Sequence, residues 1–193
     1  MKKFIYTIAL SIISFSASAE GFYFGGGLGQ SEHNLHKYSS LTYTAYDDTD
    51  VSFKIIAGYD YSNRLGVEVI YNDLGQSTAT VSTPASSETD VESLALAAVI
   101  KSDPINNFTF FAKAGQNLLH AHDDISDGTQ NGVTELNTYY GVGVSLDSSV
   151  EAGYTWRLEY EKFGTAGGTD AIRSDRPDEV DPTNISISLI KKF

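Results

Sequence analysis

The most constraining feature of this chain is a strict alternation of apolar and polar residues that recurs along most of its length. Residues 65–72, for example, read LGVEVIYN, with every second side chain apolar. Successive side chains of a β-strand point to opposite faces, so each such segment predicts a strand with one apolar and one polar face. The segments are 22–29, 51–61, 65–72, 108–115, 140–146, 154–161 and 184–193. The fold is therefore expected to be all-β.

Residues 91–101 are more ambiguous. Leu94, Leu96 and Ile100 share one strand face, but the opposite face is also apolar. Alanine and leucine favour helix, so a buried helix is the competing interpretation. Counted as a strand, this segment brings the total to eight.

The connections between these segments alternate between short and long. Short turns are expected at 62–64, 102–107 and 147–149, and long polar segments at 31–50, 76–90, 116–137 and 164–183. Outer-membrane barrels keep short turns on the periplasmic side and long loops outside. The pattern predicts an eight-stranded antiparallel up-and-down transmembrane β-barrel.

Charge and composition exclude several classes of protein. The chain has no cysteine, so it has no disulfide and no cysteine-bound zinc. Its formal net charge of −12 argues against nucleic acid as a partner. Most of the acidic residues lie in the four long segments. These are expected to be solvated loops, with a surface for cations as the alternative.

The first 19 residues carry an export signal rather than a structural element. Lys2 and Lys3 precede a short apolar run, and 17–19 reads Ala-Ser-Ala, a small-residue cleavage site. The apolar run is shorter than the roughly 20 residues that a transmembrane helix needs. We expect a signal peptide at 1–19 and one barrel domain at 20–193.

Alternation alone does not say which face of a barrel points inward, and a soluble exported barrel with an apolar cavity is the alternative to a membrane barrel. Glycine and charges of both signs on the polar faces favour a crowded polar interior. Aromatic residues gather near the short-turn end, as in the girdle of a membrane barrel. This girdle is expected to comprise Phe22, Phe24, Tyr59, Tyr61, Phe108, Phe110, Tyr154 and Trp156.

The ordered set GFYFGGGLGQS, VSFKIIAGYDYSNRLGVEVIYNDLG, FTFFAKAG, TWRLEYEKFG and ISISLIKKF resembles the OmpA-like outer-membrane β-barrel family. The resemblance implies a location in a Gram-negative outer membrane, among its lipid and lipopolysaccharide, without a peptidoglycan-binding domain. It also implies that the barrel-assembly machinery reads the last strand, through Ile185, Ile187, Leu189 and Phe193. Lys191 departs from this alternation. A closed barrel has no free edge within the membrane, so a monomer is expected.

The polar faces place three cations and three carboxylates in the middle of the predicted interior. An interior of eight strands is just wide enough for side chains to fill. A lone buried charge is costly, so the six charges are expected to pair as a plug, with a gated ion path as the alternative. They are Lys54, Glu68, Lys113, Arg157, Glu159 and Glu161.

No residue pattern points to catalysis or to a cofactor. Glu159 and Glu161 have the separation of a glycosidase pair, but any strand face gives that spacing. The four histidines, His33, His36, His120 and His122, are expected in the loops, where two pairs would form a metal site only if the loops met. The chain is therefore expected to be a non-enzyme with no metal and no cofactor.

These observations favour a structural barrel that displays four long acidic loops. A small porin or ion-permeable barrel is one alternative, and a surface adhesin or receptor acting through the loops is another. Conductance separates the scaffold from the pore, and loop deletion separates the scaffold from the adhesin.

Overall fold

The computed structural model describes residues 21–34, 43–81, 86–125, 130–147, 153–166 and 180–193. The expected signal peptide lies outside these residues. The strands are β1 (Phe22–Glu32), β2 (Tyr43–Asp47), β3 (Thr49–Ser62), β4 (Leu65–Val81), β5 (Ser86–Lys101), β6 (Phe108–Ile125), β7 (Gln130–Asp147), β8 (Tyr154–Lys162) and β9 (Thr183–Lys192). None of the described residues forms a helix that is long and apolar enough to span a membrane.

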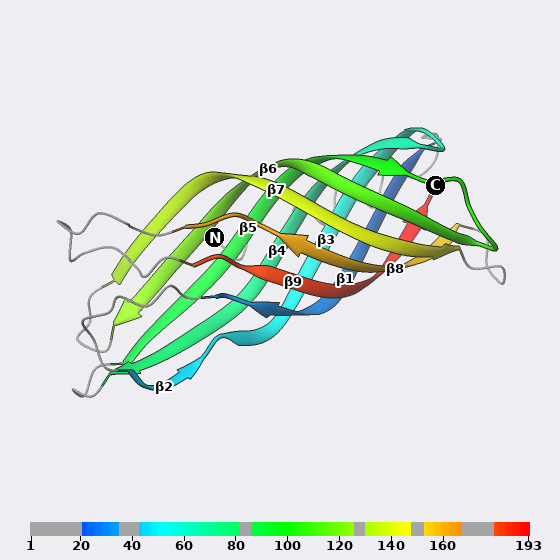
Figure 1. Ribbon diagram of the computed structural model, residues 1–193. Coiled ribbons are helices and arrows are strands. Elements are labelled where there is room, and N and C mark those ends of the chain that lie inside the picture. The colour runs from blue at the N-terminus through cyan, green and yellow to red at the C-terminus, as the bar shows by residue number, and fades with distance from the viewer. Residues whose placement is uncertain (1–20, 35–42, 82–85, 126–129, 148–152, 167–179) are drawn as a thin grey trace.

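The strands close into one barrel. Their order is β4-β3-β1-β9-β8-β7-β6-β5, and pairing of β4 with β5 completes the circle (Figure 1). All pairings are antiparallel. The short strand β2 pairs with the outer end of β4, and β3 pairs with the inner part of β4 on the same side. The two strands β2 and β3 therefore count as one strand of the barrel. The predicted eight-stranded barrel is confirmed. Residues 91–101 belong to β5, so the helix alternative is wrong.

The strands are strongly tilted. Following paired residues once around the barrel from Phe22 leads back to Glu32 on the same strand, a stagger of ten residues. For eight strands this stagger corresponds to a tilt of about 40° from the barrel axis. Each residue therefore advances roughly 2.5 Å along that axis.

The apolar faces point outward, which excludes the soluble alternative. Leu28 is 60% exposed and Val51 is 71% exposed, whereas Ser52 and Asn184 are buried inside. An apolar outer wall around a polar interior is the arrangement of a membrane barrel. The predicted orientation is therefore confirmed.

The outer ends of the strands differ from the prediction. Residues 76–90 and 116–137 were expected to be long loops, but β4 continues to Val81 and β6 to Ile125. Above the paired residues Leu94, Leu118 and Leu136, outward side chains become polar while strand pairing continues. Amphipathic alternation ends at the membrane surface, so sequence periodicity could not reveal these extensions. We call residues 76–81, 86–92, 120–125 and 130–134, together with β2, the projecting sheet.

The two sides of the barrel end at different heights. Strands β4 to β7 extend well past the outer ends of β8 and β9 (Figure 1). Beyond β8 and before β9 the two segments stay paired: the Phe163 amide donates to the Pro182 carbonyl at 3.2 Å, and Ala166 and Val180 form an isolated bridge and are both buried. The Asp181 amide then donates a 3.0 Å hydrogen bond to the carbonyl of His33.

Candidate functional site

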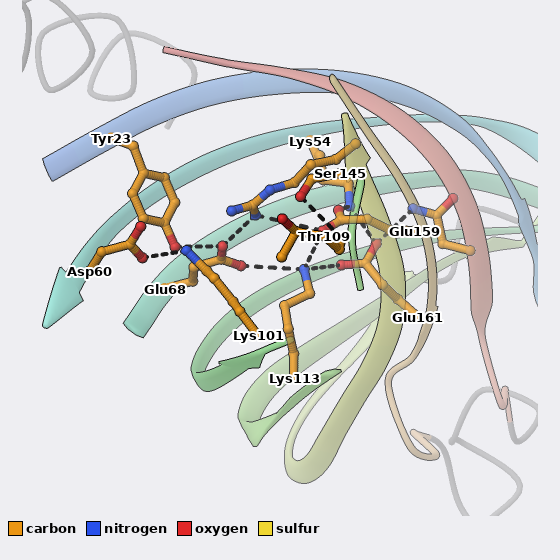
Figure 2. Close-up of polar contacts among 12 residues, drawn as sticks. Tyr23, Lys54, Asp60, Glu68, Lys101, Thr109, Lys113, Ser145, Glu159 and Glu161 are labelled. Atoms are coloured by element: carbon orange, nitrogen blue, oxygen red, sulfur yellow. Dashed lines mark hydrogen bonds and ion pairs between the residues drawn. The ribbon is translucent and has the colours of Figure 1, made fainter. Parts of the chain in front are cut away.

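The six charges expected in the interior are all buried. Figure 2 shows Lys54, Glu68, Lys113, Glu159 and Glu161 pointing toward one another. The six charges come from four strands, and each is at most 3% exposed. We call them the charged layer: Lys54 on β3, Glu68 on β4, Lys113 on β6, and Arg157, Glu159 and Glu161 on β8.

Lys113 is the most highly connected member of the charged layer. Its Nζ lies 2.9 Å from Glu159 Oε1, 3.2 Å from Glu161 Oε1 and 3.4 Å from Glu68 Oε2. Lys54 donates to Glu161 Oε2 at 2.7 Å and also to Glu159. Three carboxylates thus share one ammonium group.

Arg157 completes the layer on the periplasmic side. Its guanidinium donates to Glu68 Oε1 at 2.5 Å. The layer contains three positive and three negative groups, so it is neutral as a unit. Desolvating charges is costly, and close pairing is what offsets that cost here.

Two tyrosines, which sequence analysis did not assign to the interior site, belong to it. Tyr23 donates to Glu68 Oε1 at 2.7 Å, and Tyr139 donates to Glu161 Oε1 at 2.5 Å. Phe111 also points inward, with its ring centroid 5.0 Å from the Arg157 guanidinium carbon. Strand parity could have identified Tyr23, because it alternates with the outward Phe22 and Phe24.

A second ion pair lies at the periplasmic opening. Lys101 Nζ is 2.5 Å from Asp60 Oδ1, and both groups are partly buried. On the adjoining turns, Arg64 pairs with Asp103 at 2.5 Å, and both side chains are exposed. The hydrogen bond from Arg64 and its positive charge hold the pKa of Asp103 below its ordinary value.

Above the charged layer the interior holds apolar side chains together with buried polar ones such as Ser77, Thr89 and His33. We call the fully buried side chains Leu74, Val91, Leu119, Phe163 and Val180 the apolar plug. Phe163 directly follows β8, and Val180 lies shortly before β9. The Phe163 ring packs against Tyr139, with ring centroids 5.5 Å apart, which joins the plug to the charged layer.

The outer wall holds the other residues singled out in the sequence. The eight girdle aromatics lie on the outward face near the periplasmic end, and Tyr59 packs against Phe22 at 4.7 Å between ring centroids. On β9 the outward positions are Ile185, Ile187 and Leu189, followed by Phe193. Lys191 Nζ lies 4.2 Å from the Tyr154 ring centroid, so its charge is held at the girdle.

The three histidines that the structure describes do not form one cluster. His120 and His122 were expected in a loop but lie on β6, on the outward face, with stacked rings 6.4 Å apart. His33 is buried at the mouth, and His36 lies outside the described residues. The described part of the chain contains no group of three metal-binding side chains. The strand extension explains this difference, because it moves the second pair onto the wall.

A closed eight-stranded barrel with an apolar outer wall and a polar interior defines the class of outer-membrane β-barrel proteins. The chain belongs to the family of the OmpA-like transmembrane domain, whose model matches residues 17–190. It is accordingly a protein of the outer membrane. No curated protein matches the chain in sequence.

Solved structures with the same fold include Neisserial surface protein A (NspA). It is 19% identical, with a TM-score of 0.62, covering 92% of this chain and all of that chain. Ail, the attachment invasion locus protein of Yersinia pestis, is 15% identical with a TM-score of 0.52, covering 89% and 99% of the two chains. OprG from Pseudomonas aeruginosa is 11% identical with a TM-score of 0.55, covering 91% and 97%. At these identities the likeness shows the fold alone.

Proposed function

We propose that this protein is a closed, non-conducting barrel that presents its projecting sheet as a recognition surface to macromolecules outside the cell. The observation that carries the proposal is the unbroken pairing of β6 with β7 out to Asp124 and Gln130, well above the last outward leucines. An insulating scaffold alone needs no ordered sheet outside the membrane. The filled interior supports the non-conducting part of the proposal.

The negative charge of the projecting sheet indicates which class of macromolecule would bind it. Outward or exposed carboxylates on the projecting sheet include Glu88, Asp90 and Glu92. Ail, which shares the fold, has been crystallised with the heparin analogue sucrose octasulfate. An acidic sheet disfavours such a polyanion here, and we propose a protein partner with basic residues.

A shortened variant tests the proposal. His120 and Thr134 are paired, so residues 121–133 can be replaced by Asn-Gly, which favours a two-residue hairpin turn. We expect the variant to insert and to keep its heat-dependent gel mobility, while bacteria that display it lose attachment to a surface coated with a basic polypeptide such as polylysine. A matched control removes only the residues between Asp124 and Gln130. Unchanged attachment with the shortened variant would favour the purely structural scaffold.

A second candidate is an ion-permeable barrel. The specific observation in its favour is that Lys113 faces three carboxylates within 3.4 Å, so it could exchange partners without becoming unpaired. Planar bilayer recordings separate the two candidates. The closed barrel predicts little or no steady conductance, whereas large stable single-channel steps would support the pore.

A further inference from the structure

One edge of the projecting sheet has no partner strand among the residues that the structure describes. Strand β7 pairs with β6 along its whole length, but its ladder with β8 begins only at Tyr140 and Lys162. Residues 130–139 therefore have β6 on one side, and no described strand pairs with their other side. Near the base of this edge the Asn137 side chain donates to the Thr165 carbonyl at 2.7 Å. The open part is thus 130–136.

The register identifies which backbone groups face the open side. The Asp147 amide donates to the Asn107 carbonyl at 3.1 Å, on the β6 side of the strand. In an antiparallel ladder, residues alternate between bonding one neighbour and the other. The β6–β7 register contains no shift, so odd-numbered residues of β7 bond β6. The N–H and C=O groups of Gly132, Thr134 and Leu136 therefore point to the open side.

Apart from the charge of Glu135, this edge lacks the features that usually protect an exposed strand. Proteins block edges with lysine, proline, bulges or very short strands. Residues 130–139 contain no lysine, arginine or proline. The opposite edge of the projecting sheet, β2, has only five residues and a register shift between Tyr43 and Ala45. The two edges differ, and only β7 offers a long regular template.

The open edge lies outside the membrane. Leu136 marks the end of the apolar wall on β7, and its outward neighbours above are Thr134 and Gly132. Six residue steps along a strand tilted by about 40° place Gln130 roughly 15 Å above Leu136. Water, rather than lipid, surrounds the backbone groups above Leu136.

A second copy of this barrel is a poor occupant. Two copies in one membrane are related by an axis along the membrane normal, so facing β7 strands, each tilted by about 40°, would cross at about 80°. Crossing strands cannot share a ladder of hydrogen bonds. A separate molecule that approaches from outside is not restricted in this way.

We propose that the open edge of β7, residues 130–136, accepts an extended peptide segment of an extracellular protein as an additional strand. This inference rests on the proposed function and names the chemistry of its partner. Backbone groups of the peptide would bond those of Gly132, Thr134 and Leu136, and side chains would provide selectivity. On one face of β7 the partner would meet Val133 and Glu135, and on the other Thr134 and Leu136. A strand with alternating basic and β-branched residues fits both faces.

Amide hydrogen exchange in lipid nanodiscs tests the proposal, with a seven-residue peptide of alternating valine and lysine as the probe. We expect the amides of Gly132, Thr134 and Leu136 to exchange rapidly in the free barrel. Saturating peptide should slow them at least about tenfold. The amides of Val133 and Glu135, which face β6, should change little. A peptide with proline at its centre is the control and should give no protection.

A pair of variants separates backbone pairing from side-chain binding. Leu136→Pro removes one donor on the open side and leaves the bonds to β6, whereas Leu136→Ala keeps that donor. We expect the peptide to protect the alanine variant and not the proline variant, while both keep the heat-dependent gel shift of the folded barrel.

Three results would overturn the inference. The first is protection of the even-numbered amides without peptide, which would mean that this chain or a second copy already covers the edge. The second is peptide binding without new protection. The third is attachment that survives Leu136→Pro but is lost in the 121–133 replacement. This result would support the projecting sheet as a recognition surface and exclude strand addition at the β7 edge.

Discussion

The charged layer and the apolar plug fill the same barrel in two different ways. The layer combines three cations and three carboxylates and depends on every partner being present. The plug depends on packing, where neighbouring side chains can partly relax around a smaller residue. The charged layer therefore specifies one arrangement of β3, β4, β6 and β8, whereas the apolar plug only seals the mouth.

Removing the shared cation, Lys113, should show the largest difference between the charged layer and the apolar plug. Lys113→Met leaves three buried carboxylates with two cations, and we expect a loss of about 3–5 kcal/mol in the free energy of unfolding. Urea titration in detergent, followed by gel mobility, measures it. A double variant with Glu159→Leu restores neutrality and should recover part of the loss. An equal loss in both variants would mean that packing, not charge balance, sets the stability of the layer.

Conductance of the same variant shows whether the charged layer or the apolar plug closes the barrel to ions. The apolar plug lies above the charged layer, so Lys113→Met should remain non-conducting in planar bilayers. Steady ion flow through this variant alone would show that the layer, and not the plug, closes the barrel.

Truncation in the plug should cost somewhat less. Leu119 is fully buried, and Leu119→Ala is expected to destabilise the barrel by about 3 kcal/mol through lost burial and a residual cavity. The same urea titration provides the measurement, with exposed Leu118→Ala as the matched control on the lipid side. A negligible effect would mean that the mouth is loosely packed.

Acid should weaken the mouth more than the middle of the barrel. Burial lowers the pKa of His33, although Asp50 and Asp48 oppose this shift. The folded state thus favours the neutral ring, and its contribution to stability is present above about pH 6.5 and is lost as pH falls. The midpoint of urea unfolding should decrease from pH 7 to pH 5. His33→Phe should show a smaller decrease, and an identical slope would exclude His33 as the cause.

The smallest effect is expected at the periplasmic turns. Arg64 and Asp103 form an ion pair, but their side chains are 69% and 68% exposed. Water and salt screen such pairs, so Arg64→Ala should leave the unfolding midpoint unchanged. A clear loss of stability would show that this pair holds the two turns together.

Strand parity was sufficient to predict the charged layer residue by residue, because both its charges and their periodicity are visible in the sequence. Parity also places four members of the apolar plug on inward positions, namely Leu74, Val91, Leu119 and Phe163. Val180 was not predictable in this way, because it follows a polar segment and lies outside the strands. Sequence periodicity does not mark the projecting sheet, because its outward face is polar rather than apolar. Gly75, with φ of +75°, adds a bulge that shifts the alternation within β4.

The distribution of the charged layer along the chain has a consequence for assembly. Its members come from an early hairpin, a middle strand and the penultimate strand, and the seam that closes the barrel joins β1 to β9. Until those distant segments meet, each charge needs water. A half-built barrel that enters lipid would carry uncompensated charge, so closure and insertion should occur together as one all-or-none event.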